Sequence, residues 1–225
     1  MPECRVLLYS ITDRTACASI VAHRRRALLA KIHEAAAAGI DYIQLRERDL
    51  SARELQALTA QAVELLRKFP GTRVLVNSRI DVALAAGAHG AHLRADDISP
   101  ADARGIWRQA RPQDKPVIAV SCHSSEELAA AEKSGADFAV LGPVFEKQNA
   151  GRAPLGIEGL RKILGARERM QPRAMPVLAL GGVTPENASA CLRAGVAGIA
   201  GIRLFQRGNI AGTVRALRQL ASCTP

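Results

Sequence analysis

The chain has few aromatic residues and few cysteines, and each shortage excludes a class of protein. Phe, Tyr and Trp together make up 3% of the 225 residues, too few for the stacking platform of a single-strand nucleic-acid binder. The cysteines are scattered, odd in number and without a C-x-x-C spacing: Cys4, Cys17, Cys122, Cys191 and Cys223. This pattern predicts reduced thiols in a cytoplasmic protein rather than a disulfide framework.

Long apolar runs and acidic residues are also scarce. No stretch approaches the roughly 18 consecutive apolar residues of a membrane span. The N-terminal MPECRVLLYSITDR has neither the charged lead-in nor the cleavage site of a signal peptide. Acidic residues number 21 against 31 basic ones, for a net charge of +10. Because the basic residues are spread out, apart from Arg24–Arg26, we interpret them as solvated helix faces rather than a nucleic-acid surface. A phosphorylated small ligand is another use for the positive charge.

Short apolar runs alternate with helical patterns along the whole chain. The expected strands are Val6–Ile11, Asp41–Leu45, Arg73–Val76, Gly90–Leu93, Val117–Ser121, Phe138–Leu141, Val177–Leu180 and Gly198–Ile202. The expected helices are Arg24–Ala38, Ala52–Lys68, Asp81–Ala86, Ala101–Gln109, Ser125–Ser134, Ile157–Glu168, Glu186–Ala194 and Ile210–Leu220. This alternation predicts a single α/β domain over residues 1–225, a (β/α)8 TIM barrel. An open doubly wound sheet is the alternative, but no G-x-G-x-x-G follows the first strand.

Four similar phrases support the barrel: AAAAGIDYI, LAAGAHGAHL, AEKSGADFAV and LRAGVAGIAG. In each, we expect a helix to end on a glycine that takes the left-handed conformation before the next strand. These glycines are Gly39, Gly87, Gly135 and Gly195. A repeat of two βα units is typical of a barrel assembled from βαβα quarters.

In a TIM barrel the chemistry lies at the carboxyl ends of the strands. Polar residues follow most of the expected strands: Gln44, Arg46, Arg48, Asn77, Asp97, Ser121, His123 and Arg203. The last two strands end in glycines, Gly181-Gly182 and Gly201. Glycine lets backbone N–H groups approach a phosphate closely, and Arg203 would add a guanidinium. We therefore predict an active or binding site at this end, with a phosphate-binding cup after the last two strands.

Four longer segments resemble a known family: QLRER, LVNSRIDVALAAGAHGAHL, VSCHSSEELAAAEKSGADFAVLGPVFE and LALGGVTPENASACLRAGVAGIA. They are similar to thiamine phosphate synthases and TenI-type thiazole tautomerases, and the resemblance extends over residues 40–205. It implies an enzyme of thiamine biosynthesis. A synthase of this family joins hydroxymethylpyrimidine diphosphate to thiazole phosphate and releases diphosphate with the help of Mg²⁺. A tautomerase only shifts a proton on thiazole carboxylate phosphate and needs no metal.

The resemblance assigns roles to several strand-end residues. It implies that Gln44 and Arg46 contact the pyrimidine and the diphosphate. Arg48 stands where the family has a lysine, which keeps the charge but changes the geometry. Asn77 matches a family asparagine among the substrate-binding residues, and Asp97 matches one of the magnesium-binding aspartates.

Besides Arg48, two single residues and one loop depart from the family pattern. Ser78 replaces the other magnesium-binding aspartate, Glu146–Asn149 replace the P-T-x-T-K diphosphate loop, and Arg203 stands where a serine is usual. Asp97 alone is a weak anchor for Mg²⁺, which prefers several oxygen ligands. We therefore expect no required cofactor, with Mg²⁺ needed only if the chain is a synthase. The role of Glu146–Asn149 stays open.

Ser121 and His123 match the family's S-x-H motif, and we predict that they are catalytic. Residues two apart on a strand share a face, so both side chains should reach the mouth of the barrel. Histidine suits a proton shift near neutral pH. The favoured function is therefore a TenI-like tautomerase. A working synthase and an inactive phosphate-binding barrel are the alternatives.

The expected partners follow from the same interpretation. They are a phosphorylated thiazole and, for a synthase, a pyrimidine diphosphate as well. Neither nucleic acid nor a membrane is expected, and a homo-oligomer is left open.

Overall fold

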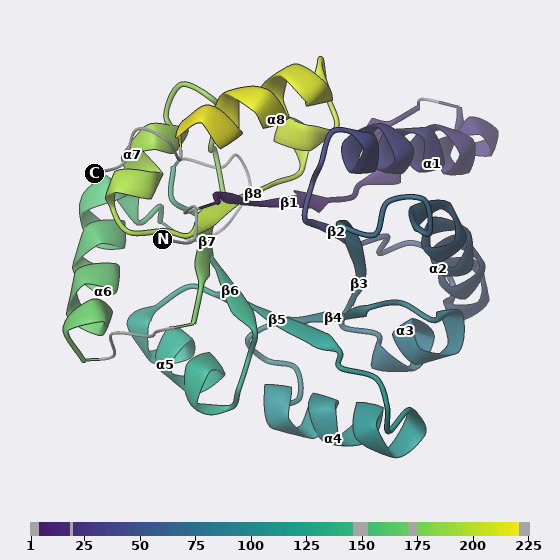
Figure 1. Cartoon of the computed structure of the whole chain (residues 1–225), viewed down its shortest axis with the longest axis horizontal. Helices are drawn as coiled ribbons and strands as arrows, with labels where there is room; N and C mark the ends of the chain where they lie inside the picture. The colour runs from purple at the N-terminus through teal and green to yellow at the C-terminus, as the bar shows by residue number, and fades with distance from the viewer. Residues whose placement is uncertain (1–4, 19, 146–152, 171–174, 221–225) are drawn as a thin grey trace.

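The computed structural model is a closed barrel of parallel strands surrounded by helices (Figure 1). It describes residues 5–18, 20–145, 153–170 and 175–220. The strands are β1 (Leu7–Ile11), β2 (Tyr42–Leu45), β3 (Arg73–Asn77), β4 (Gly90–Leu93), β5 (Val117–Cys122), β6 (Phe138–Leu141), β7 (Val177–Ala179) and β8 (Gly198–Gly201). Each strand pairs with the next in the chain, and β8 closes the barrel on β1 with Tyr9 opposite Ala200. The predicted (β/α)8 barrel is confirmed.

A helix follows every strand. The helices are α1 (Val21–Ala37), α2 (Ala52–Leu66), α3 (Ile80–Ala86), α4 (Pro100–Ala110), α5 (Ser125–Lys133), α6 (Gly156–Met170), α7 (Ala188–Arg193) and α8 (Ile210–Gln219). Two short 3₁₀ helices that the periodicity does not reveal, η1 (Arg14–Ala16) and η2 (Arg203–Phe205), follow β1 and β8. Within the described residues, no helix combines the length and the apolar character that a membrane crossing requires.

Local signals set most helix boundaries. Ser51 and Glu54 form a reciprocal capping box at the start of α2. The four repeat glycines all have positive φ angles, between 71° and 102°, as the left-handed conformation requires. The expected start of the seventh helix at Glu186 is two residues early, because Asn187 precedes the first helical residue of α7. The side chain of Asn187 instead accepts the N–H of Thr184 and donates to the carbonyl of Gly182.

Two apolar clusters form the core. The larger lies between the barrel and the helices, and it includes Trp107 and Cys122, both buried. The smaller fills the interior of the barrel. There the ring of Phe138 packs against Tyr9 and Tyr42, with ring centroids 5.3 Å and 4.8 Å away. Tyr42 and Phe138 are the first residues of their strands, so their rings fill the amino end of the barrel, whereas other members of the cluster extend to the carboxyl end.

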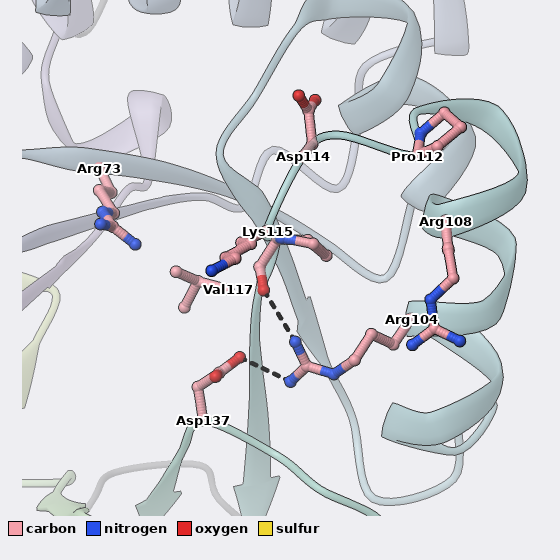
Figure 2. Close-up of a pocket in the computed structure, with 9 residues that line it drawn as sticks. Arg73, Arg104, Arg108, Pro112, Asp114, Lys115, Val117 and Asp137 are labelled. Atoms are coloured by element: carbon pink, nitrogen blue, oxygen red, sulfur yellow. Dashed lines mark hydrogen bonds and ion pairs between the residues drawn. The ribbon is translucent and has the colours of Figure 1, made fainter.

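The amino end also carries a basic cavity of about 420 Å³ (Figure 2). Its cationic lining residues are Arg73, Arg104, Arg108 and Lys115. The guanidinium of Arg104 donates to the Asp137 carboxylate, 2.9 Å away, and to the carbonyl of Pro116. These bonds tie α4 to the segments that lead into β5 and β6. Residues at this end of a TIM barrel usually serve stability.

Candidate active site

A cavity of about 930 Å³ opens at the carboxyl ends of the strands. Six of the predicted site residues line it together: Gln44, Arg46, Arg48, Asn77, Ser121 and His123. They come from β2, β3 and β5 and from the loops that follow β2 and β5. We call this space the mouth cavity.

A second cavity of about 330 Å³ lies beside it, after β7 and β8, and is lined by Gly181, Gly182, Gly201 and Arg203. Leu180 and Ile202 line both cavities, so the two spaces adjoin. Arg203 does not end a strand as expected. It begins η2, because β8 stops at Gly201. We call this space the glycine cup.

Glycine is required in the cup for steric reasons. Gly181 and Gly182 have φ angles of 101° and 68°, a conformation that strains residues with a Cβ. A Cβ on Gly181 would lie 2.7 Å from the Cβ of Pro143, and one on Gly201 would lie 2.8 Å from the Cβ of Leu204. Both contacts are with the protein itself, so these two glycines let the loops pack closely on Pro143 and Leu204, and Gly182 is the glycine of the cup that is exposed.

A chain of polar side chains crosses the mouth from β2 to the loop after β4. The amide of Gln44 donates to the Asn77 amide oxygen at 3.3 Å, and Asn77 donates to the hydroxyl of Ser78 at 3.2 Å. Ser78 in turn donates to the Asp97 carboxylate at 2.6 Å. Among the described residues, Ser78 alone has a positive φ, 57°, without being a glycine. Such strain is typical of functional sites.

Asp97 is committed to protein donors rather than open to a metal. Its carboxylate accepts the hydroxyl of Ser78, the backbone N–H of Arg94 and the Arg94 guanidinium. Partial burial would raise the pKa of Asp97, but these hydrogen bonds lower it below its usual value. The described part of the chain contains no group of three or more His, Cys, Asp or Glu side chains able to hold a metal ion. Magnesium usually binds through one or two carboxylates together with water and substrate phosphates, so a magnesium ion at Asp97 would need oxygen ligands from water and the substrate.

Arg46 and Arg48 supply positive charge without a counter-ion. Neither guanidinium forms a hydrogen bond or ion pair with the described residues, whereas the cavity-lining Arg79 and Arg94 pair with aspartates. Arg46 is half-buried, and burial together with the nearby Arg48 lowers the pKa of its guanidinium. Two adjacent guanidinium groups of this kind have the charge and the hydrogen-bond donors that proteins use to bind phosphate groups.

His123 is held in one orientation at the edge of the mouth cavity. Its Nδ1 lies 2.5 Å from the carbonyl oxygen of Gly142. Because a carbonyl only accepts, Nδ1 carries a proton, and Nε2 of the neutral ring is left as an acceptor. The carboxylate of Glu127 accepts the backbone N–H of His123 at 2.6 Å and fixes its position further.

A buried polar chain runs below the mouth cavity. The hydroxyl of Tyr9 lies 2.9 Å from Nδ1 of His92, and Nε2 of His92 lies 2.7 Å from the hydroxyl of Ser121. Burial, with a contribution from the positive charge of Arg46, lowers the pKa of His92 to about 3. His89, three residues before His92, accepts the backbone N–H of Val74. The two histidines therefore serve different partners.

The low pKa of His92 predicts acid sensitivity. Unfolded His92 takes up a proton below about pH 6.5, whereas the folded ring stays neutral down to about pH 3. The unfolded state thus binds more protons than the folded state in this range. This proton uptake stabilises the unfolded state, so the free energy of unfolding falls as the pH falls. When the pH is lowered from 6.5 to 5.5, the free energy of unfolding of wild type should fall by about 1 kcal/mol more than that of His92→Gln. Urea unfolding at the two pH values measures this difference. Equal losses in both proteins would show that His92 does not stay neutral.

Some lining residues are absent from the sequence prediction. Arg79 and Arg94 also line the mouth cavity, and their positions just after β3 and β4 are the signal that could have identified them. Tyr9 resembles an ordinary core residue in the sequence. The spacing of Ser124 and Glu127 indicates a helix cap, and Ser124 provides one. The spacing does not indicate the hydrogen bond that the backbone N–H of His123 donates to the Glu127 carboxylate. The loop Glu146–Asn149 lies outside the described residues.

The fold and these cavities define a class: a (β/α)8 barrel with two adjoining cavities at its mouth, one lined by arginines and one by glycines. The family model for thiamine monophosphate synthase matches residues 8–205. The thiamine-phosphate synthase of Caldanaerobacter subterraneus is 35% identical over 216 residues, which cover 95% of this chain and 92% of that protein. The one from Moorella thermoacetica is 33% identical over 200 residues, covering 88% and 90%.

A solved structure agrees with these sequence relatives. Thiamine phosphate pyrophosphorylase from Pyrococcus furiosus superposes with a TM-score of 0.76 at 30% identity, over 96% of each chain. The chain belongs to the thiamine monophosphate synthase family, as the resemblance implied, and it is an enzyme of thiamine biosynthesis.

Proposed function

We propose that this enzyme is a working thiamine-phosphate synthase. The observation that supports this most is the pair of adjoining spaces, one with unpaired guanidinium groups and one formed by glycine backbone. A condensation brings two phosphorylated substrates side by side, whereas a tautomerase binds one. The relatives named thiamine-phosphate synthase also favour a synthase. The sequence alone favours a tautomerase because Ser78 replaces an aspartate of the family.

In this proposal each space binds one substrate. The diphosphate lies against Arg46 and Arg48, the pyrimidine lies near the amides of Gln44 and Asn77, and the thiazole phosphate lies in the glycine cup. The bond between the pyrimidine methylene carbon and the diphosphate oxygen breaks, and its electron pair leaves with the diphosphate. The thiazole nitrogen then forms the new carbon–nitrogen bond. The two guanidinium groups stabilise the charge that develops on the leaving oxygen, which is usually the largest contribution in such steps.

Product analysis tests the proposal. Hydroxymethylpyrimidine diphosphate and thiazole phosphate together should give thiamine phosphate and diphosphate in equal amounts, and neither substrate alone should react. Parallel samples with Mg²⁺ and with a chelator measure the metal requirement. Proton shift on thiazole carboxylate phosphate without condensation would identify a tautomerase. Binding without either reaction would identify an inactive barrel.

The tautomerase is the second candidate, and the geometry of His123 favours it. Its Nε2 is an acceptor on a ring that lines the mouth cavity, as a general base requires. If this activity exists, His123→Gln should lower its turnover about 10²- to 10⁴-fold and leave phosphate binding nearly unchanged, since the cup lies on other strands. A variant that keeps more than about a third of the turnover would rule out a general-base role.

A further inference from the structure

The buried chain of Tyr9, His92 and Ser121 fixes the direction of its own hydrogen bonds. Tyr9 is completely buried in the inner apolar cluster, and within the described residues its hydroxyl has one hydrogen-bond partner, Nδ1 of His92. A phenol carries one proton, which must find an acceptor. If Nδ1 of His92 donated to Tyr9, the phenol proton would be buried without a partner, which is unfavourable. The hydroxyl of Tyr9 therefore donates to Nδ1.

The rest of the chain follows from this direction. Because Nδ1 accepts, the single proton of the neutral imidazole lies on Nε2. Nε2 then donates to the oxygen of Ser121, 2.7 Å away. Ser121 is half-buried, lines the mouth cavity and has no other hydrogen bond to the described residues. Its own proton is thus directed to whatever occupies the cavity.

We propose that Tyr9 and His92 are positioning residues that make Ser121 a dedicated hydrogen-bond donor to a substrate acceptor atom. Without His92, a serine hydroxyl could donate or accept, and could bind an amino group as readily as an unprotonated nitrogen. With His92 donating to it, Ser121 selects an acceptor, which is a ring nitrogen or a diphosphate oxygen of the pyrimidine substrate. The identity of this substrate rests on the proposed function, but the direction of the hydrogen bonds does not.

Nitrogen NMR of histidine-labelled protein without ligand tests the direction. His92, assigned by the loss of its signals in His92→Gln, should show a protonated Nε2 and an unprotonated Nδ1 from pH 5 to pH 8. The opposite tautomer, or a charged ring in this range, would overturn the proposal, because Ser121 would then donate to His92 or Tyr9 would lack an acceptor. This measurement is independent of any enzymatic activity.

A double-mutant cycle tests the consequence for the substrate. Ser121→Ala should lower kcat/KM about tenfold, the loss of one hydrogen bond. Tyr9→Phe should cause part of this loss in wild type and none in the Ser121→Ala background, because Tyr9 acts through Ser121. Tyr42→Phe is the control, since its ring packs in the same cluster without a described bond to His92. Full additivity of the Tyr9 and Ser121 effects would contradict the proposal and indicate a packing role.

The substrate atom can be located with ligand binding alone. If the condensation is not observed, calorimetric Kd values for hydroxymethylpyrimidine diphosphate replace kcat/KM in the same cycle, so that failure of the proposed function leaves this test intact. Inorganic diphosphate distinguishes the two acceptors. If Ser121→Ala weakens the binding of inorganic diphosphate as much as that of the pyrimidine diphosphate, Ser121 donates to the diphosphate. If the affinity for inorganic diphosphate is unchanged, Ser121 donates to the pyrimidine ring. Unchanged binding of the complete pyrimidine compound overturns the proposal.

Discussion

Arg46→Ala is expected to lower kcat/KM for the pyrimidine diphosphate about 10²- to 10³-fold, the usual effect of removing a group that stabilises developing charge. The guanidinium of Arg46 is half-buried, lines the mouth cavity and has no acidic partner among the described residues. A diphosphate would therefore gain a charged, partly desolvated contact that water cannot replace. Steady-state kinetics with varied pyrimidine diphosphate measures the effect.

Two variants serve as controls for this prediction. Arg46→Lys keeps the charge but loses the planar fork, so its activity should lie between wild type and Arg46→Ala. Arg73→Ala removes the same charge at the amino end of the barrel, where Arg73 is exposed, and it should leave kcat/KM unchanged. Equal losses in Arg46→Ala and Arg73→Ala would mean that the overall charge, rather than the site, attracts the substrate.

Gly182→Val should abolish the binding of thiazole phosphate. The residue has a φ of 68° and lines the glycine cup, so a branched side chain would be strained and would occupy the space of the phosphate. In wild type, thiazole phosphate should raise the melting temperature by mass action. A thermal-shift titration should show this response in wild type and none in Gly182→Val.

The matched control for backbone strain is Gly135→Val. Gly135 has a φ of 76° and open space around the position of its Cβ, and it precedes β6 at the amino end of the barrel. Its substitution introduces similar strain far from the cup, and the response to thiazole phosphate should persist. A lost response in both variants would show that stability, not the cup, determines binding.

The barrel could be predicted from the sequence because its strands are buried on both faces. Such strands are short apolar runs, and amphipathic helices with recognisable caps and glycine ends separate them. The positions of Gln44, Asn77 and Ser121 at the mouth follow from the same argument, since parallel strands place their carboxyl ends at one edge.

The contacts between strands could not be predicted in this way. Tyr9 and His92 are 83 residues apart in the chain and meet only because barrel closure and register bring β1 and β4 to a common interior. An apolar alternation pattern describes Tyr9 as a core residue and contains no information on its hydroxyl. In the same way, the pairing of Ser78 with Asp97 depends on the unusual backbone of Ser78, and no residue type near it indicates a positive φ.

A crystal structure of the enzyme with thiamine phosphate and diphosphate would test most directly whether the two adjoining spaces form one synthase site. We predict that the phosphate of thiamine phosphate lies against the backbone of Gly181 and Gly182, that the pyrimidine lies beside Gln44 and Asn77, and that diphosphate contacts Arg46. A thiamine phosphate bound in the reverse orientation, or bound with the glycine cup empty, would contradict the account.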